Sequence, residues 1–191
     1  MKNFLNISEI SSQDLRSIID EASLRKSNRD NLNKSSPDKD KPFEGKSMVM
    51  IFEKPSTRTR ISFDIAVKQL GGSSIFLNPE GIHYGKGDES IKDTAKVLSE
   101  YADIIMIRTS NHKNLEEFAK HLNIPIINGL SDKSHPCQIM SDILTFEEVK
   151  GNIKNKSIAW LGDGNNNMSN SLIEAASKFE FNLNIGCPKK Y

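Results

Sequence analysis

The sequence contains the segment Met48-Val49-Met50-Ile51-Phe52-Glu53-Lys54-Pro55-Ser56-Thr57-Arg58-Thr59-Arg60, in which an apolar run leads into hydroxyl and guanidinium side chains. The apolar run predicts a buried strand over 48–52, and Pro55 interrupts it. A helix is expected to start near Thr57 and to reach Leu70, where Gly71-Gly72 ends it. The segment therefore predicts a strand, a turn and a helix, which is the repeating unit of a parallel α/β sheet.

The same alternation extends along the rest of the chain. The first helix is expected to start at the cap-like Ser11–Asp14, and a polar loop is expected over 27–46. Further strands are expected at 73–77, 104–107, 125–128, 157–161 and 182–185, and further helices at 90–101, 114–122, 136–149 and 168–179. The fold class that follows is α/β, a parallel sheet flanked by helices.

A polar stretch over 150–156 divides this pattern into two parts. Residues 1–150 are expected to form one complete domain, and residues 151–191 the start of a second α/β domain. A single β-α-β unit is too small to bury a core of its own, since small domains already bury only ~60% of their surface. We therefore expect the second domain to be incomplete.

Composition excludes several classes of function. With 26 Lys and Arg against 25 Asp and Glu, the formal net charge is +1, which is not the basic field of a nucleic-acid-binding protein. No apolar run is long enough to cross a membrane, and no secretory signal is apparent, so a cytoplasmic location is expected. Cys137 and Cys187 lack metal-ligand spacing and predict neither a zinc site nor a disulfide framework.

The turn at Ser56–Arg60 predicts an anion-binding site. The first N–H groups of a helix have no backbone partner, and the helix dipole makes this end positive. Hydroxyl groups from Ser56, Thr57 and Thr59 add donors, and Arg58 adds a planar fork suited to phosphate oxygens. The simpler alternative is a capped helix with two solvated arginines, but arginines beside a positive helix end are unfavourable without an anion. The Gly-Lys-Ser/Thr pattern of a Walker loop is absent.

Other polar side chains follow the ends of neighbouring predicted strands. His83 follows the second strand of the main group, Arg108 ends the third, and His135 and Gln138 follow the fourth. Each residue alone has a common structural role, as an ion-pair partner, a packed histidine or a helix cap. Because parallel strands end at the same edge of a sheet, where ligands bind, we expect these groups to surround one small anion.

Cys137 lies between these groups. A nucleophilic thiol would need a neighbouring base and a depressed thiolate pKa. We favour a packing or substrate-shaping role for this residue.

The combination of Ser56–Arg60, Arg108 and His135-Pro136-Cys137-Gln138 resembles the carbamoyl phosphate site of the aspartate and ornithine carbamoyltransferase family. Segments 89–95 and 128–132 are also similar to family sequences, and the resemblance extends over essentially the whole chain.

Within that family, the resemblance is stronger to members that act on ornithine. Members that act on aspartate have Thr where this chain has Cys137, and 162–168 resembles the first substrate-side loop of the ornithine-specific members.

The resemblance implies roles for individual residues. Those expected to bind carbamoyl phosphate are Ser56, Thr57, Arg58, Thr59, His83, Arg108, His135 and Gln138. Those expected to take part in catalysis are Arg58, Thr59, Arg108, His135 and Gln138. Asn167 is expected to contact the α-amino acid group of L-ornithine. His83 corresponds to a residue that reaches into a neighbouring subunit's site, and the implied assembly is a homotrimer.

The implied reaction transfers the carbamoyl group to the ornithine δ-amine and gives citrulline and phosphate, a step of arginine biosynthesis. Arg58, Thr59 and His135 would stabilise the developing oxyanion, with ~3–4 kcal/mol typical of each such donor. No metal or organic cofactor is implied. Family members continue beyond residue 191 with a Ser-Met-Gly loop and a His-Cys-Leu-Pro segment, so we expect this chain to retain phosphate binding with little or no turnover.

Three alternatives stay open from the sequence. Gly162-x-Gly164-x-x-Asn167 lies between a predicted strand and helix, as a dinucleotide fingerprint does, but it lacks the third glycine and the later acidic residue. The chain could instead be a non-catalytic carbamoyl phosphate binder. It could also derive from a sister transferase that uses another amine, such as putrescine or an acylated ornithine.

Overall fold

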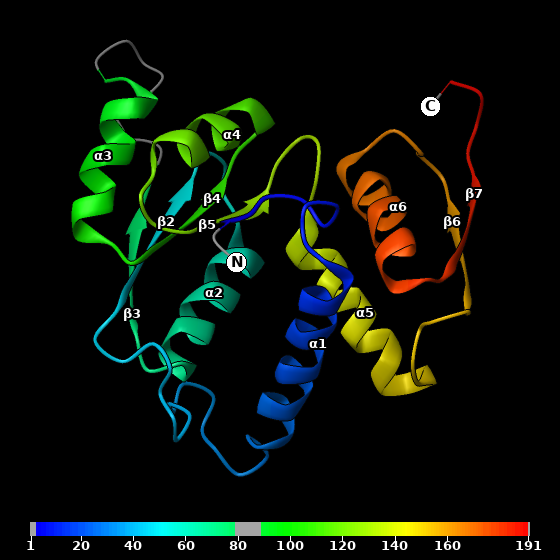
Figure 1. Cartoon of the computed structure of the whole chain (residues 1–191), viewed down its shortest axis with the longest axis horizontal. Coiled ribbons are helices and arrows are strands. Elements are labelled where there is room, and N and C mark those ends of the chain that lie inside the picture. Colours follow the sequence, from blue (N-terminus) through cyan, green and yellow to red (C-terminus); the bar gives the residue numbers. More distant parts are fainter. Residues whose placement is uncertain (1–2, 79–88, 191) are drawn as a thin grey trace.

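Five parallel strands form the main sheet in the order β1-β5-β4-β2-β3 (Figure 1). This is a computed structural model, and it describes residues 3–78 and 89–190. The strands of this sheet are β1 (Asn3–Phe4), β2 (Ser47–Phe52), β3 (Ser73–Leu77), β4 (Ile104–Arg108) and β5 (Ile126–Leu130). The segment that contains the predicted phosphate turn supplies β2, which lies between β3 and β4.

Helices connect the strands and cover both faces of the sheet. They are α1 (Ser12–Ser27), α2 (Thr57–Gln69), α3 (Ile91–Tyr101), α4 (His112–His121), α5 (Pro136–Lys150) and α6 (Asn167–Phe179). In Figure 1, α3 and α4 lie on one side of the sheet and α2 on the other. Each of these helices follows a strand, so the parallel crossover predicted from the sequence is confirmed.

The apolar run in β2 is continuous because both faces of this strand are buried. Met48, Met50 and Phe52 pack in the cluster that includes residues of α2. Val49 and Ile51 pack in the cluster formed with α3 and α4. A strand covered on both faces needs apolar residues at every position, unlike the alternating pattern of a half-exposed strand.

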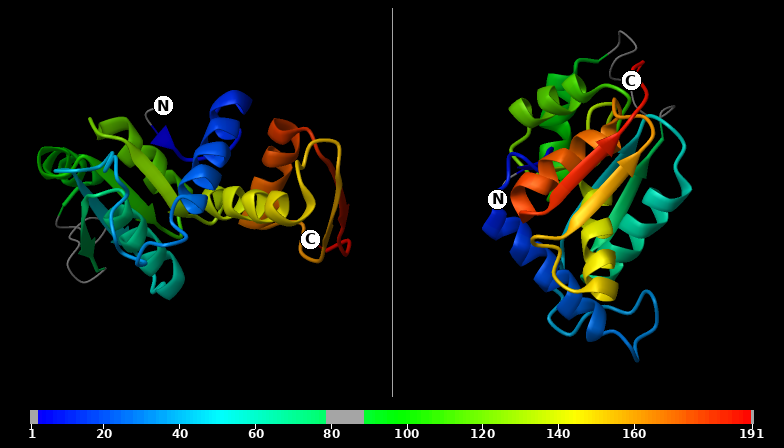
Figure 2. Two further views of the ribbon diagram at one scale, coloured as in Figure 1. Left: turned by 90° about the horizontal axis from the view of Figure 1, so that it is seen from below. Right: turned by 90° about the vertical axis from the view of Figure 1, so that its right-hand side faces the viewer.

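A second parallel sheet consists of β6 (Ser157–Leu161) and β7 (Asn182–Gly186). Figure 2 shows this pair apart from the main sheet, with α1, α5 and α6 between the two. A third apolar cluster joins these three helices, and it includes Leu15, Ile143 and Ala175. The start of a second α/β unit, expected from the sequence, is therefore present and packs on the first.

The structure contains one short strand that was not expected from the sequence, and the ends of several other elements differ from the expected ones. The short strand β1 was not predicted, because two residues carry no periodicity and pair only through β5. Helix α4 starts two residues earlier than expected, and α6 starts one residue earlier. Their first turns are capped by Asn111 and Asn166, whose side chains accept from backbone N–H groups. Strand β5 extends to Leu130, beyond the predicted end at 128.

Among residues 3–78 and 89–190, no helix combines the length and apolar character needed to span a membrane.

Candidate active site at the carboxyl ends of the strands

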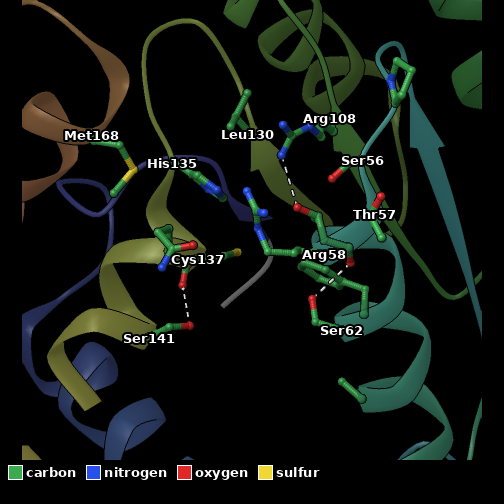
Figure 3. Close-up of a pocket in the computed structure, with 15 residues that line it drawn as sticks. Ser56, Thr57, Arg58, Ser62, Arg108, Leu130, His135, Cys137, Ser141 and Met168 are labelled. Atoms are coloured by element: carbon green, nitrogen blue, oxygen red, sulfur yellow. Dashed lines mark hydrogen bonds between the residues drawn. The ribbon is translucent and has the colours of Figure 1, made fainter. Parts of the chain in front are cut away.

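A cleft of about 830 Å³ opens where α2 and α5 begin, beyond the ends of β4 and β5 (Figure 3). The predicted carbamoyl phosphate residues that line it are Ser56, Thr57, Arg58, Thr59, Arg108, His135 and Gln138. His83, the remaining predicted residue, lies outside the residues that the structure describes. The tertiary structure thus brings together side chains from three separate segments, as the strand-end argument anticipated.

Both helices that begin at the cleft lack a side-chain cap. Ser56 precedes α2 and His135 precedes α5, and neither side chain accepts a hydrogen bond from the following turn. The other four helices in the described chain are each capped by a serine or asparagine side chain. Two sets of first-turn N–H groups therefore face the cleft region without a capping side chain, an arrangement that favours an anion.

Two guanidinium groups extend into the same cleft. Arg108 donates from Nη1 to Thr59 Oγ1 over 3.1 Å, which ties the end of β4 to the start of α2. Burial and then the nearby Arg58 lower the pKa of Arg108 from its usual value. The Nε atom of Arg108 is buried and has no partner within the described chain. No acidic side chain lines the described part of the cleft, so nothing there balances these positive charges.

An irregularity in strand pairing sets the position of Arg108. Ile107 pairs with Asn128, whereas Arg108 pairs with Leu130, so Gly129 is an extra residue in β5. A Cβ atom at Gly129 would lie 2.3 Å from the Met106 sulfur, which explains glycine at this point. Bulges of this kind redirect side chains near functional sites, and this one lies at the strand end that carries Arg108.

His135 is half-buried and points towards Arg58 and Arg108 in Figure 3. Burial, followed by the charge of Arg108, lowers the pKa of His135 to about 4. The imidazole is therefore neutral near pH 7. Its Nδ1 atom is buried and has no partner among the described residues. A neutral imidazole can donate one hydrogen bond from whichever nitrogen carries the proton.

Cys137 is not arranged as a nucleophile. Its thiol donates to the Asn128 carbonyl oxygen at 3.4 Å, and burial raises the pKa of Cys137 to about 12. The protonated thiol supports the packing or shaping role favoured from the sequence. Gln138 is exposed, and its amide donates to Asp142 one turn further along α5 at 2.9 Å.

Two residues of the sequence argument lie outside the cleft. Asn167 donates from Nδ2 to the Ser131 carbonyl oxygen at 2.7 Å, so in this structure its amide contacts the loop before α5. Arg60 is stacked on Phe76, with its guanidinium carbon 3.6 Å from the ring centroid. Of the two arginines in the turn, only Arg58 contributes to the cleft.

Sequence reasoning did not single out Ser62, Ser141 and Met168, which also line the cleft. Ser62 lies four residues after Arg58, and Ser141 lies three residues after Gln138, so helical spacing could have identified both. Their hydroxyl groups donate to carbonyl oxygens of their own helices, at 3.1 and 3.0 Å. Met168 comes from α6, and only the packing of the second unit brings it to the cleft.

Comparison with known families agrees with this geometry. A family model described as "Aspartate/ornithine carbamoyltransferase, carbamoyl-P binding domain" matches residues 2–148. A second, described as "Aspartate/ornithine carbamoyltransferase, Asp/Orn binding domain", matches residues 154–191. The chain belongs to the aspartate/ornithine carbamoyltransferase family. It is therefore a member of a family of transferases, and the resemblance stated from the sequence is confirmed.

Individual family members are similar over nearly the whole chain. An ornithine carbamoyltransferase of Rhizobium meliloti is 51% identical over 187 residues, which are 98% of this chain and 59% of that protein. The structure of ornithine carbamoyltransferase from Pyrococcus furiosus is 39% identical, with a TM-score of 0.92, and the match covers 100% of this chain and 58% of that one. The corresponding Burkholderia thailandensis structure is 36% identical, with a TM-score of 0.91, and covers 100% and 63%. The chain thus spans about 59% of the length of curated relatives that it matches.

Proposed function

We propose that the cleft binds carbamoyl phosphate and that the protein from which this chain comes transfers the carbamoyl group to the δ-amine of L-ornithine, giving citrulline and phosphate. The observation that carries the proposal is the pair of helix starts without side-chain caps, at Ser56 and His135. They open on one cleft that contains Arg58 and Arg108 and has no acidic residue in its described lining. A small dianion with a polar, uncharged end matches such a site.

The residues of the cleft fall into two proposed roles. Arg58 and Arg108 hold the phosphate group through charge-assisted hydrogen bonds and stabilise it as it leaves. Ser56 and Thr57 add hydroxyl donors beside the uncapped start of α2. This end of the site would retain the phosphate while the bond to the carbamoyl carbon breaks.

Thr59, His135 and Gln138 serve the carbamoyl end in this proposal. When the amine attacks the carbamoyl carbon, negative charge develops on the carbamoyl oxygen, and Arg58, Thr59 and His135 are the proposed donors to it. The lowered pKa of His135 fits this role, because a neutral imidazole donates a hydrogen bond without protonating the incoming amine. Catalysis would then rest on positioning and on electrostatic stabilisation.

The proposal that ornithine is the acceptor is supported by the names of similar proteins. The curated relatives and the solved structures at 0.90–0.92 TM-score carry the name ornithine carbamoyltransferase. Cys137 in place of the Thr of aspartate-specific members supports the same choice. A role in arginine biosynthesis follows from that acceptor, with Asn167 as a contact for the ornithine α-amino acid group once its bond to Ser131 is exchanged.

Two further parts of the proposal concern organisation. We propose a carbamoyl phosphate-binding domain over 1–150 and the beginning of an ornithine-binding domain over 151–191. We also propose a homotrimer in which His83 reaches a neighbouring subunit's site. The cytoplasmic location expected from the sequence stays a prediction.

A non-catalytic carbamoyl phosphate binder is the second candidate for the chain itself. It is favoured by one observation, that the chain spans about 59% of the length of relatives such as the Rhizobium meliloti enzyme. A dinucleotide site has less support. The start of α6 is closed by a capping box between Asn166 and Ser169, so these donors are already paired with the chain.

Titration calorimetry tests the proposed ligand. We expect saturable binding of carbamoyl phosphate by the purified chain, and no binding of NAD under the same conditions. With carbamoyl phosphate bound, L-ornithine should bind more tightly than L-aspartate or putrescine. Binding of NAD without carbamoyl phosphate would contradict the proposal, whereas a preference for putrescine would point to a sister transferase.

A further inference from the structure

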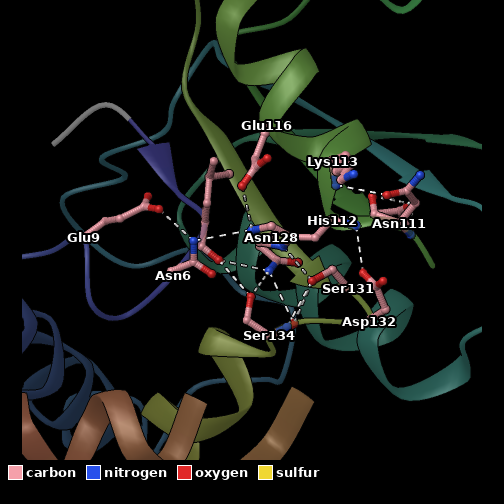
Figure 4. Close-up of polar contacts among 12 residues, drawn as sticks. Asn6, Glu9, Asn111, His112, Lys113, Glu116, Asn128, Ser131, Asp132 and Ser134 are labelled. Carbon is pink, nitrogen blue, oxygen red and sulfur yellow. Dashed lines mark hydrogen bonds and ion pairs between the residues drawn. The ribbon is translucent and has the colours of Figure 1, made fainter. Parts of the chain in front are cut away.

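The loop between β5 and α5 places His135 in the cleft, and a buried polar network fixes one side of this loop (Figure 4). Asn128 Nδ2 donates to Ser134 Oγ at 2.8 Å. The ring of His112 lies 2.8 Å from Ser131 Oγ, and the His112 backbone N–H donates to Asp132 at 2.7 Å. These contacts tie the loop to the main sheet and to α4.

The other side of the same loop is held by α6, which belongs to the second α/β unit. Asn167 Nδ2 donates to the Ser131 carbonyl oxygen at 2.7 Å, and Asn170 Nδ2 donates to the Lys133 carbonyl oxygen at 3.1 Å. The His135 backbone N–H donates to Ser171 Oγ at 2.9 Å. Residues 167, 170 and 171 lie on one face of a helix. One face of α6 thus contacts the loop at three successive points.

Of the three α6 residues, Ser171 is the one that contacts His135 itself. This serine is fully buried, with 0% exposure, and its hydroxyl accepts from the backbone N–H of His135, the residue that precedes α5. The Nδ1 atom of the His135 ring is buried, and no hydrogen bond from the described chain holds it in place. The direction of the imidazole therefore depends on its backbone, and Ser171 fixes that backbone.

We propose that Ser171 is a positioning residue that aims His135 at the carbamoyl end of the ligand, and so couples the second α/β unit to the first. This inference rests on the proposed function of the cleft. Arg58 and Arg108 lie on α2 and β4, in the first α/β unit, and Arg108 is held there by its bond to Thr59. A change at Ser171 is therefore expected to affect the carbamoyl end of the site and to leave the phosphate end unchanged.

The test compares two ligands on the 191-residue chain by titration calorimetry. In Ser171→Ala, the affinity for carbamoyl phosphate should fall about tenfold, the scale of one lost hydrogen bond, while the affinity for inorganic phosphate should stay within about twofold. Ser177→Ala, an exposed serine of the same helix, should change neither affinity. An equal loss for both ligands in Ser171→Ala would overturn the proposal, because it would indicate general damage to the site.

A double-mutant cycle tests whether Ser171 acts through His135. His135→Ala should reduce carbamoyl phosphate affinity, and adding Ser171→Ala to it should produce no further loss. Independent, multiplying losses would overturn the proposal, since they would give Ser171 a role separate from the imidazole.

The ring signals of His135 in an NMR spectrum separate this inference from the proposed function. They should shift in Ser171→Ala and not in Ser177→Ala, with or without ligand. Unchanged signals in Ser171→Ala overturn the positioning role. If the unsubstituted chain binds no carbamoyl phosphate, the proposed function fails, and shifted signals would still support the positioning of His135 by Ser171.

Discussion

Three arginines in this chain have the same chemistry and different surroundings. Arg25 forms ion pairs with Asp38 and Asp40, and Arg60 is stacked on Phe76. Arg58 lines the cleft and forms no salt bridge with any residue that the structure describes. Arg58 is suited to binding an anionic ligand, because no Asp or Glu lies in the described lining of its cleft. The guanidinium groups of Arg25 and Arg60 instead contact other side chains of the protein.

Arg58→Ala is expected to weaken carbamoyl phosphate binding roughly ten- to hundredfold, the effect of losing hydrogen bonds to a charged group worth ~1.5–3 kcal/mol. Titration calorimetry measures this change. Arg25→Ala and Arg60→Ala are matched controls that remove the same charge elsewhere, and each should alter the affinity by less than about threefold. Equal losses in all three variants would count against the assignment of Arg58.

His135 predicts how stability depends on pH. Its pKa in the folded chain is about 4, below the usual 6.5. As the pH falls from about 6.5 towards 4, the unfolded chain takes up a proton at this residue and the folded chain does not, so the free energy of unfolding decreases. The lowered pKa of His112, caused first by burial, adds to the decrease.

Urea denaturation at a series of pH values checks this prediction. His135→Gln removes one titrating group, so the decrease between pH 6.5 and 4 should be smaller in this variant than in the unsubstituted chain. Identical curves would mean that His135 titrates alike in the folded and unfolded states.

At the scale of elements, the helix starts differ according to their surroundings. Ser90 caps α3 by accepting from the Asp93 N–H at 3.1 Å. Ser56 occupies the same position before α2 and makes no such bond. Identical residue types thus have different roles, because α3 begins at the surface and α2 begins at the cleft.

This difference predicts opposite effects of one substitution. Ser90→Ala should lower the free energy of unfolding by about 1 kcal/mol, the usual cost of losing a cap, and should leave carbamoyl phosphate affinity unchanged. Ser56→Ala should change stability by less than ~0.5 kcal/mol and should weaken binding. Chemical denaturation and calorimetry on both variants test the pair, and a stability loss in Ser56→Ala equal to that in Ser90→Ala would show that Ser56 is an ordinary cap.

At the scale of the whole molecule, an apolar interface between helices joins the two α/β units. Helices α1, α5 and α6 share one apolar cluster, so the second unit packs on the first by burial of apolar surface. Its sheet has two strands, and Leu161 is 82% exposed. The cleft is lined mostly by the first unit, and Met168 is the residue that the second unit contributes to its described lining.

The purified 191-residue chain is expected to bind carbamoyl phosphate and to form no citrulline from ornithine. The chain spans about 59% of the length of the Rhizobium meliloti relative, and turnover requires the acceptor amine to be held in line with the carbamoyl carbon. A colorimetric assay for citrulline measures turnover, with calorimetric binding of carbamoyl phosphate as the control that the chain is folded. Sustained citrulline formation would contradict this expectation.

Local chemistry made much of this structure predictable. The apolar run at 48–52 and the repeated strand-helix alternation determined the α/β class, because they are short-range patterns. The hydroxyl and guanidinium cluster after the run predicted an anion-binding turn. The sequence also identified Arg108, His135 and Gln138 as residues of the same edge, since parallel strands end together.

Only the tertiary structure decided which polar groups face the cleft and which are paired elsewhere. It directs Arg58 into the cleft and Arg60 onto Phe76, places Asn167 on Ser131, and brings Ser171 to the backbone of His135. These contacts join segments distant in the chain, and their geometry depends on how the helices pack. The sequence by itself therefore determined the fold class and predicted the kind of ligand, whereas the packing of helices decided which side chains line the cleft.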